Sequence, residues 1–151
     1  MEKFIIMEQV TIKVLDFTDA PGPRYIRQDK KGEMTSGEAF YIYVLNPKFK
    51  ECYEAEKQLI IELDGVSGYP SSFLDEAIGE LVYDFSRAIV DKFLDFDTIM
   101  YKKRVLQVKE ETYPQWEQRR IKGDIVVHSS DINKSVYFLN SRGNLEVKQI
   151  P

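Results

Sequence analysis

The chain has 151 residues, 43% of them apolar, and a formal net charge of −4, values that are ordinary for one globular domain. The negative charge argues against a protein whose whole surface binds nucleic acid or anionic lipid. The single cysteine, Cys52, excludes an intramolecular disulfide, and no apolar run approaches the roughly 20 residues that cross a bilayer. Residues 1–10 lack the apolar core and cleavage site of a signal peptide, so we expect a cytoplasmic protein without a membrane partner.

The first half of the chain predicts alternating strands and helices. Residues 4–17 read as strand, either one long strand or a hairpin, because Val10, Ile12 and Val14 alternate with other side chains. Residues 18–35 hold two prolines and two glycines and read as a loop. A helix is expected to begin near Thr35. Asn46-Pro47 is expected to end that helix and start the next one.

The middle of the chain predicts a buried strand followed by a long helix. Residues 59–63, LIIEL, are aliphatic and short, as in a central strand covered on both faces. After the turn at 64–71, a helix is expected from about Ser72 to Asp91, with Ser72 as its N-cap and Asp75 at the capping-box position. Its apolar arc is wide enough to indicate a helix packed on several sides, and Gly79 inside it indicates close packing against a neighbouring element.

The C-terminal part predicts one more strand, a helix and three short β runs. Residues 96–101 read as strand, and a helix is expected near residues 105–122, starting close to Tyr113 because of Pro114. Runs at 125–130, 135–139 and 145–150 predict an antiparallel β-meander that either extends the main sheet or forms a small addition to it. We therefore expect an α/β fold with a mixed β-sheet and packed helices, divided into residues 1–104 and an extension, 105–151, of the same domain.

The sequence offers little catalytic chemistry. His128 is the only histidine and has no acid or nucleophile arranged around it locally, so we interpret it as structural. One histidine and one cysteine do not supply a zinc site, and the glycine patterns that bind phosphate are absent. The basic clusters at 102–104 and 119–122 are interpreted as solvated faces. We therefore expect no enzyme, no cofactor or metal, and no nucleic-acid partner.

The turn at 64–72, DGVSGYPSS, is the richest feature, because α/β sheets place functional loops at the carboxyl ends of strands. One interpretation is that its serines only satisfy free N–H groups at the helix start. In the other, an exposed hydroxyl carries a phosphate, which the helix N-terminus favours and which would disrupt a partner docked there.

The segment LIIELDGVSGYPSSFLDEAIGELV resembles the STAS-like family of unknown function, as do PGPRY (21–25) and SGEAF (36–40) upstream. The resemblance spans about residues 21–82. STAS domains proper include bacterial anti-sigma-factor antagonists, which bind a serine-kinase anti-sigma factor through the loop and helix after the central strand. The resemblance places the serine phosphorylated in those proteins on Ser72, while Pro70 and Phe73 replace the aspartate and glycine that flank it there.

The resemblance implies a regulatory interaction module of bacterial signalling that docks a protein partner, such as a kinase-like ATPase. The expected docking residues are Ser67, Gly68, Tyr69, Ser71, Ser72 and Phe73. A second hypothesis is an anion or nucleotide site between the helix starts near Ser36 and Ser71, and its expected residues are Arg24, Ser36, Gly37 and Glu38. A third is an accessory role in a defence or toxin–antitoxin-type locus, with the C-terminal strands as the interface. The oligomeric state, including a homodimer, is left open.

Overall fold

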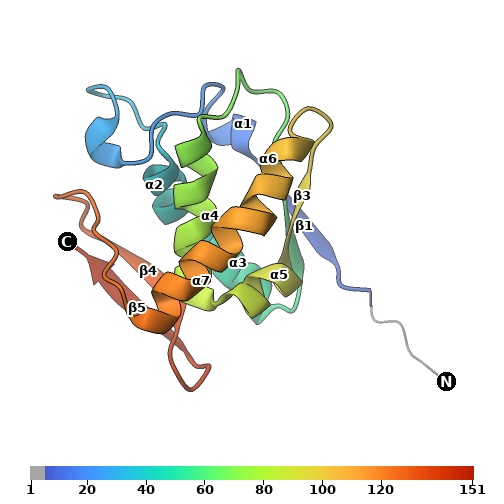
Figure 1. The fold of residues 1–151 in the computed structure, drawn as a ribbon, viewed down its shortest axis with the longest axis vertical. Helices are drawn as coiled ribbons and strands as arrows, with labels where there is room; N and C mark the ends of the chain where they lie inside the picture. Colours follow the sequence, from blue (N-terminus) through green and yellow to red (C-terminus); the bar gives the residue numbers. More distant parts are fainter. Residues whose placement is uncertain (1–5) are drawn as a thin grey trace.

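The computed structural model describes residues 6–151 and contains a parallel three-stranded sheet (Figure 1). Its strands are β1 (Gln9–Lys13), β2 (Gln58–Glu62) and β3 (Leu94–Asp97), and both outer strands pair in parallel with β2. The central position expected for residues 59–63 is confirmed, because β2 lies between β1 and β3; Leu59 and Ile61 on one face are fully buried, and Ile60 on the other face is partly exposed. The first strand is shorter than expected: Val14–Phe17 form a helical turn, α1, and the expected start at residues 4 and 5 lies outside the described residues.

Two long helical runs pass through prolines without stopping. The first joins α2 (Gly37–Phe40), the π-helical turn η2 (Tyr41–Leu45) and α3 (Asn46–Glu54); the second joins α6 (Lys102–Gln107), the π-helical turn η3 (Val108–Thr112) and α7 (Tyr113–Lys122). The expected breaks at Asn46-Pro47 and near Tyr113 are therefore wrong. Proline lacks an N–H and its ring clashes with the carbonyl four residues earlier, and the wider π turn before each proline accommodates both effects. The boundary drawn between residues 104 and 105 falls inside α6.

The central helix of the fold is α4 (Ser71–Phe85), which packs between α2 on one side and α7 on the other (Figure 1). The packing expected on several sides is confirmed. The helix ends earlier than expected, because Ser86 has a positive φ of 84° and caps a separate helix, α5 (Arg87–Phe93). Gly79 faces Trp116 of α7 with no room for a side chain.

The C-terminal β runs form a separate antiparallel hairpin, β4 (Lys134–Leu139) and β5 (Leu145–Ile150), beside the helices (Figure 1). The α/β class is confirmed, but the parallel and antiparallel strands belong to two sheets rather than to one mixed sheet. Residues 125–130 are not the third strand of a meander, since Ser129 is held by Glu38 of α2 instead of by a neighbouring strand. The remaining short helix is η1 (Ile26–Gln28), and no helix within residues 6–151 is long and apolar enough to cross a membrane.

Candidate functional site

The turn between β2 and α4 is fixed from the inside by two tyrosines. The Tyr69 hydroxyl donates to the Leu63 carbonyl at 2.7 Å, and the Tyr69 ring packs edge-on against Tyr101 with centroids 4.7 Å apart. The Tyr101 hydroxyl in turn donates to the Val66 carbonyl at 3.0 Å. The backbone of the turn is therefore held in one conformation at the carboxyl end of the parallel sheet.

Some of the expected docking residues lie at the surface, and others are buried in the core. Ser67 and Ser71 are exposed, and Gly68 and Ser72 are partly exposed. Tyr69 and Phe73 are 5% and 0% exposed, so their rings belong to the core and do not contribute to a docking surface in this conformation.

The expected capping of α4 by Ser72 is wrong. The helix begins at Ser71, its N-cap is Pro70, and no side chain caps it. The Asp75 carboxylate does not complete a capping box either. It accepts hydrogen bonds from Arg24 at 2.8 Å and from the Thr112 hydroxyl at 2.9 Å.

A second loop, which the sequence did not single out, lies beside this turn. The Asp64 carboxylate accepts hydrogen bonds from the Thr98 hydroxyl at 2.6 Å and from the N–H groups of Ile99 and Met100 at 2.7 and 3.1 Å. Hydrogen bonding to Thr98 and to these N–H groups lowers the pKa of Asp64. The loop presents the side chains of Ile99 and Met100 to solvent, with 80% and 74% of their surface exposed. The strand expected at residues 96–101 is shifted, because β3 covers Leu94–Asp97 and the loop begins at Thr98.

We define the carboxyl-end surface by exposed or partly exposed residues of neighbouring α1, of these two loops and of the start of α4: Leu15, Ser67, Gly68, Ser71, Ser72, Ile99 and Met100. Leu15 adjoins the turn, because its Cδ2 lies 3.0 Å from where a Cβ at Gly65 would be. A shallow hollow beside Ile99 and Met100 is also lined by Lys102, Lys103 and Arg104. The surface is thus apolar at Ile99 and Met100 and basic along one border.

A cavity of about 210 Å³ opens at the start of α4, and its lining includes Arg24, Ser71 and Arg104. Arg24 is already paired with Asp75 at 2.8 Å and with Glu76 at 3.1 Å. Carboxylates therefore compensate the charge of Arg24. Arg104, the other arginine of the cavity, donates a hydrogen bond to the neutral Gln107, and no carboxylate contacts it among the described residues.

The expected anion site between the two helix starts is closed. Ser36 is fully buried, and its hydroxyl caps α2 by accepting from the Ala39 N–H at 3.1 Å. A Cβ on Gly37 would lie 2.3 Å from the Phe73 carbonyl oxygen, so the two helix starts meet without space between them. The Glu38 carboxylate, also fully buried, would repel an anion.

A buried acidic stripe runs along α4, formed by Glu76, Glu80 and Asp84 at intervals of four residues and at most 5% exposed. Each acid has a basic partner from a distant part of the chain, namely Arg24, His128 and Lys148 respectively. The spacing of the acids is visible in the sequence. Their burial is not, because it depends on partners 52, 48 and 64 residues away.

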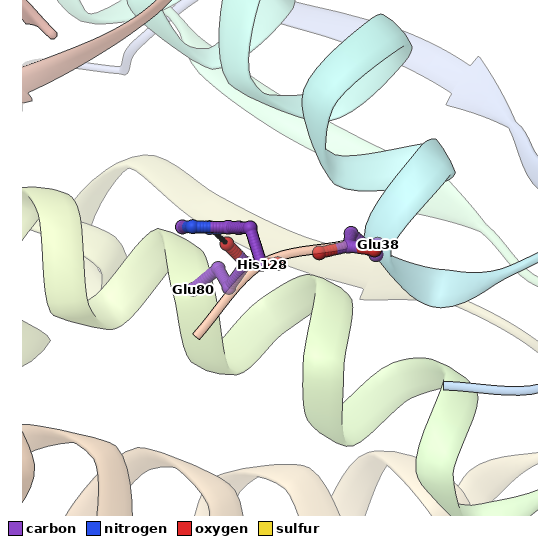
Figure 2. A group of neighbouring side chains, drawn as sticks. All are labelled: Glu38, Glu80 and His128. Atoms are coloured by element: carbon purple, nitrogen blue, oxygen red, sulfur yellow. Dashed lines mark hydrogen bonds and ion pairs between the residues drawn. The ribbon is translucent and has the colours of Figure 1, made fainter. Parts of the chain in front are cut away.

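His128 lies beside Glu80 of the stripe and near Glu38 of α2. Its Nε2 is 2.5 Å from Oε1 of Glu80, and one ligand atom from each of Glu38, Glu80 and His128 lies within 4.8 Å of the others (Figure 2). Burial raises the pKa of Glu80 well above its ordinary range, and the neighbouring carboxylates of Glu76, Asp84 and Glu38 add to this effect. Burial lowers the pKa of His128. Within residues 6–151, these three side chains form the group of three or more potential ligands that lie close enough together to hold a metal ion.

Comparison with known proteins identifies one family. Residues 36–98 match the model of a family described as a STAS-like domain of unknown function, which confirms the resemblance seen in the sequence. The match covers α2 through β3, including the turn at 64–72, and leaves PGPRY (21–25) and the C-terminal hairpin outside. No curated protein and no solved structure matches the chain.

Proposed function

We propose, on the premise that residues 36–98 match the STAS-like family, that this protein is a regulatory interaction module whose protein partner docks on the carboxyl-end surface. The observation that carries the proposal is the exposure of Ile99 and Met100 on a loop that Asp64 holds in place. Exposed apolar side chains gain from burial in a partner, and a loop whose backbone is already held loses little backbone entropy on binding.

The border of this surface indicates the chemistry of the partner. Lys102, Lys103 and Arg104 line the same hollow as the two apolar side chains. A complementary partner therefore presents an apolar contact bordered by acidic residues. The likeness to STAS domains adds a kinase-like ATPase of bacterial signalling as the partner class.

Ser72 is the proposed regulatory position within this surface. It lies in the first turn of α4 and is partly exposed, beside exposed Ser71. A phosphate there would be favoured by the positive end of the helix dipole, and its charge would alter docking on the neighbouring loops.

Affinity capture from cells that contain the protein naturally tests the proposal. The bait is the full chain as wild type, as Ile99→Asp/Met100→Asp, and as the control Ile121→Asp/Ile125→Asp, whose residues are 63% and 83% exposed at the end of α7 and just after it. A docked partner is expected with wild type and control and lost with the first variant. With the purified partner, the loss of two apolar contacts should weaken binding roughly 100-fold. Equal capture by both variants would remove the loop from the interface.

Ligand binding is the second proposal, supported by the cavity at the start of α4 rather than by the closed space near Ser36. Arg104 is the basic residue there without a carboxylate partner among the described contacts. Thermal unfolding with inorganic phosphate and nucleoside triphosphates tests it, with Arg104→Ala as the matched variant. A rise in melting temperature of several degrees that Arg104→Ala abolishes supports a ligand site, and a flat response contradicts it.

A further inference from the structure

Three segments that are far apart in the sequence meet at the buried acidic stripe. Glu38 reaches the meeting point from α2, Glu80 from α4, and His128 from the segment that precedes β4, as Figure 2 shows. Glu38 and Glu80 are 0% and 2% exposed. The side chain of His128 is 16% exposed and leaves the site reachable from solvent.

Part of this cluster has no hydrogen-bond partner. Within residues 6–151, Oε2 of Glu80 and Oε2 of Glu76 are both buried and accept no hydrogen bond. Glu38 accepts from the Ile26 N–H at 2.9 Å, the Ser129 N–H at 3.1 Å and the Ser129 hydroxyl at 2.6 Å. A carboxylate offers about four acceptor positions, so Glu38 retains capacity for one more ligand.

The charges around the cluster do not balance. Glu38, Glu76, Glu80 and Asp84 are buried carboxylates, and the permanent cations that contact them among the described residues are Arg24 and Lys148. Arg24 is also shared with Asp75. With all four carboxylates ionised, at least two negative charges would be uncompensated, which is costly in the interior of a protein, and one divalent cation neutralises two negative charges.

We infer that Glu38, Glu80 and His128 bind a divalent transition-metal ion of the zinc class. One imidazole and two carboxylates suit such an ion better than Mg²⁺ or Ca²⁺, which prefer oxygen ligands alone. Ligand atoms about 2.1 Å from a metal lie at most about 4.2 Å apart. The three atoms already lie within 4.8 Å of one another, and two ligand atoms of a tetrahedral ion lie about 3.4 Å apart, so a side-chain shift that also widens the 2.5 Å contact between His128 and Glu80 completes the site. The bound ion would tie α2 and α4 to the segment that leads into the C-terminal hairpin.

The alternative explanation is that a proton, rather than a metal ion, compensates the buried carboxylates. Glu76 and Glu80 lie one turn apart within hydrogen-bonding reach, and a shared proton would satisfy both unpartnered oxygens. The two explanations make different predictions for His128. Its imidazole binds the ion if a metal occupies the site, and it binds no metal if the carboxyl groups share a proton.

The experiment uses the full chain without an affinity tag, whose histidines would add ligands. His128 is the only histidine, so the imidazole signals in the proton NMR spectrum report on this site alone. The metal-free protein is titrated with Zn²⁺, and with Co²⁺ as a spectroscopic probe. Affinity is measured by competition with a chelator for wild type, Glu80→Gln, His128→Gln and the control Glu62→Gln, an acid on β2 paired with Lys13.

One equivalent of Zn²⁺ is expected to shift the imidazole signals. Glu80→Gln and His128→Gln should weaken binding by roughly 100-fold or more, and Glu62→Gln should leave it unchanged. Affinity should rise with pH, because metal binding displaces protons from its ligands. Imidazole signals that do not respond to Zn²⁺ or Co²⁺ in the wild-type protein would overturn the inference, as would equal affinity of Glu80→Gln and wild type. The first of these readouts requires no variant to fold.

Discussion

Gly79 of α4 and Trp116 of α7 lie so close together that a Cβ at position 79 would be 2.1 Å from Cε2 of the indole. Trp116 is 3% exposed, and the guanidinium of Arg119 lies over its ring, 4.1 Å from the ring centroid. The ring is therefore packed on more than one side and has little room to move. This contact fixes how closely the C-terminal helical run approaches the central helix.

Gly79→Ala should destabilise the protein. The substitution gains about 1 kcal/mol of helix propensity, but overpacking a filled core costs about 1–3 kcal/mol or more. At a separation of 2.1 Å we expect the steric cost to exceed the gain, so the free energy of unfolding in urea should fall. The same substitution in a Trp116→Leu background, where the ring is gone, should cost less or become favourable. An equal cost in both backgrounds would contradict the packing argument.

The sequence predicted those parts of the fold that depend on local pattern. The strand at 59–63 and the packing of the helix around Gly79 follow from side-chain periodicity and from a glycine in an apolar arc. The helix breaks expected at Pro47 and Pro114 are absent, because a π turn resolves the same steric conflict without ending the helix. Tertiary packing, which the sequence does not display, favours the continuous helix in both places.

In the candidate sites too, features that depend on neighbouring residues were predicted, and features that depend on distant residues were not. The turn after β2 was predicted from its position at the end of a central strand. The exposure of Ile99 and Met100 was not predicted. The sequence does not show that three hydrogen bonds to Asp64 hold this loop at the surface. His128 looked isolated because its partners, Glu38 and Glu80, are brought to it only by the fold.

The pKa of Asp64 should depend on Thr98. The hydrogen bond from the Thr98 hydroxyl is the largest cause of the lowered pKa, so Thr98→Val should raise the pKa toward the ordinary value of about 3.9. Because the folded-state pKa is lowered, the carboxylate contributes stability above about pH 3.9 that is lost as the pH falls through the folded pKa. NMR titration of the Asp64 carboxyl carbon measures the shift. An unchanged pKa in Thr98→Val would show that the hydroxyl does not bind Asp64 in solution.

Asn46 should anchor the C-terminal hairpin to the helices. Its Nδ2 donates to the Tyr137 carbonyl at 2.9 Å and to the Tyr41 hydroxyl at 2.9 Å, and its Oδ1 accepts from the Tyr137 N–H at 2.9 Å. Asn46→Ala removes the partner of the Tyr137 N–H and carbonyl, while the Tyr41 hydroxyl keeps its hydrogen bond to Asp84, and should cost about 1–3 kcal/mol. Amide hydrogen exchange at Tyr137 should accelerate. Gln149→Ala, which removes an exposed side-chain hydrogen bond to Ser135 on the same hairpin, is the control and should stay within about 0.5 kcal/mol of wild type.

Protonation of Glu80 should make the metal-free protein more stable as the pH falls toward the ordinary carboxyl pKa of about 4.3. Its folded-state pKa is raised, so between that ordinary value and the folded-state pKa the folded protein holds a proton that the unfolded chain has released, and stability falls as the pH rises through this window, by at most about 1.4 kcal/mol per pH unit. The lowered pKa of His128 acts in the opposite direction below about pH 6.5, because there the unfolded chain binds the extra proton.

The Glu80→Gln variant isolates the two effects. Urea unfolding of wild type and variant in the presence of a chelator gives their difference in stability at each pH. As the pH falls, the free energy of unfolding of wild type should rise relative to that of Glu80→Gln. The free energy of unfolding of Glu62→Gln should change with pH as that of wild type does. A difference that does not change with pH would mean that Glu80 is ionised in the folded protein throughout the range measured.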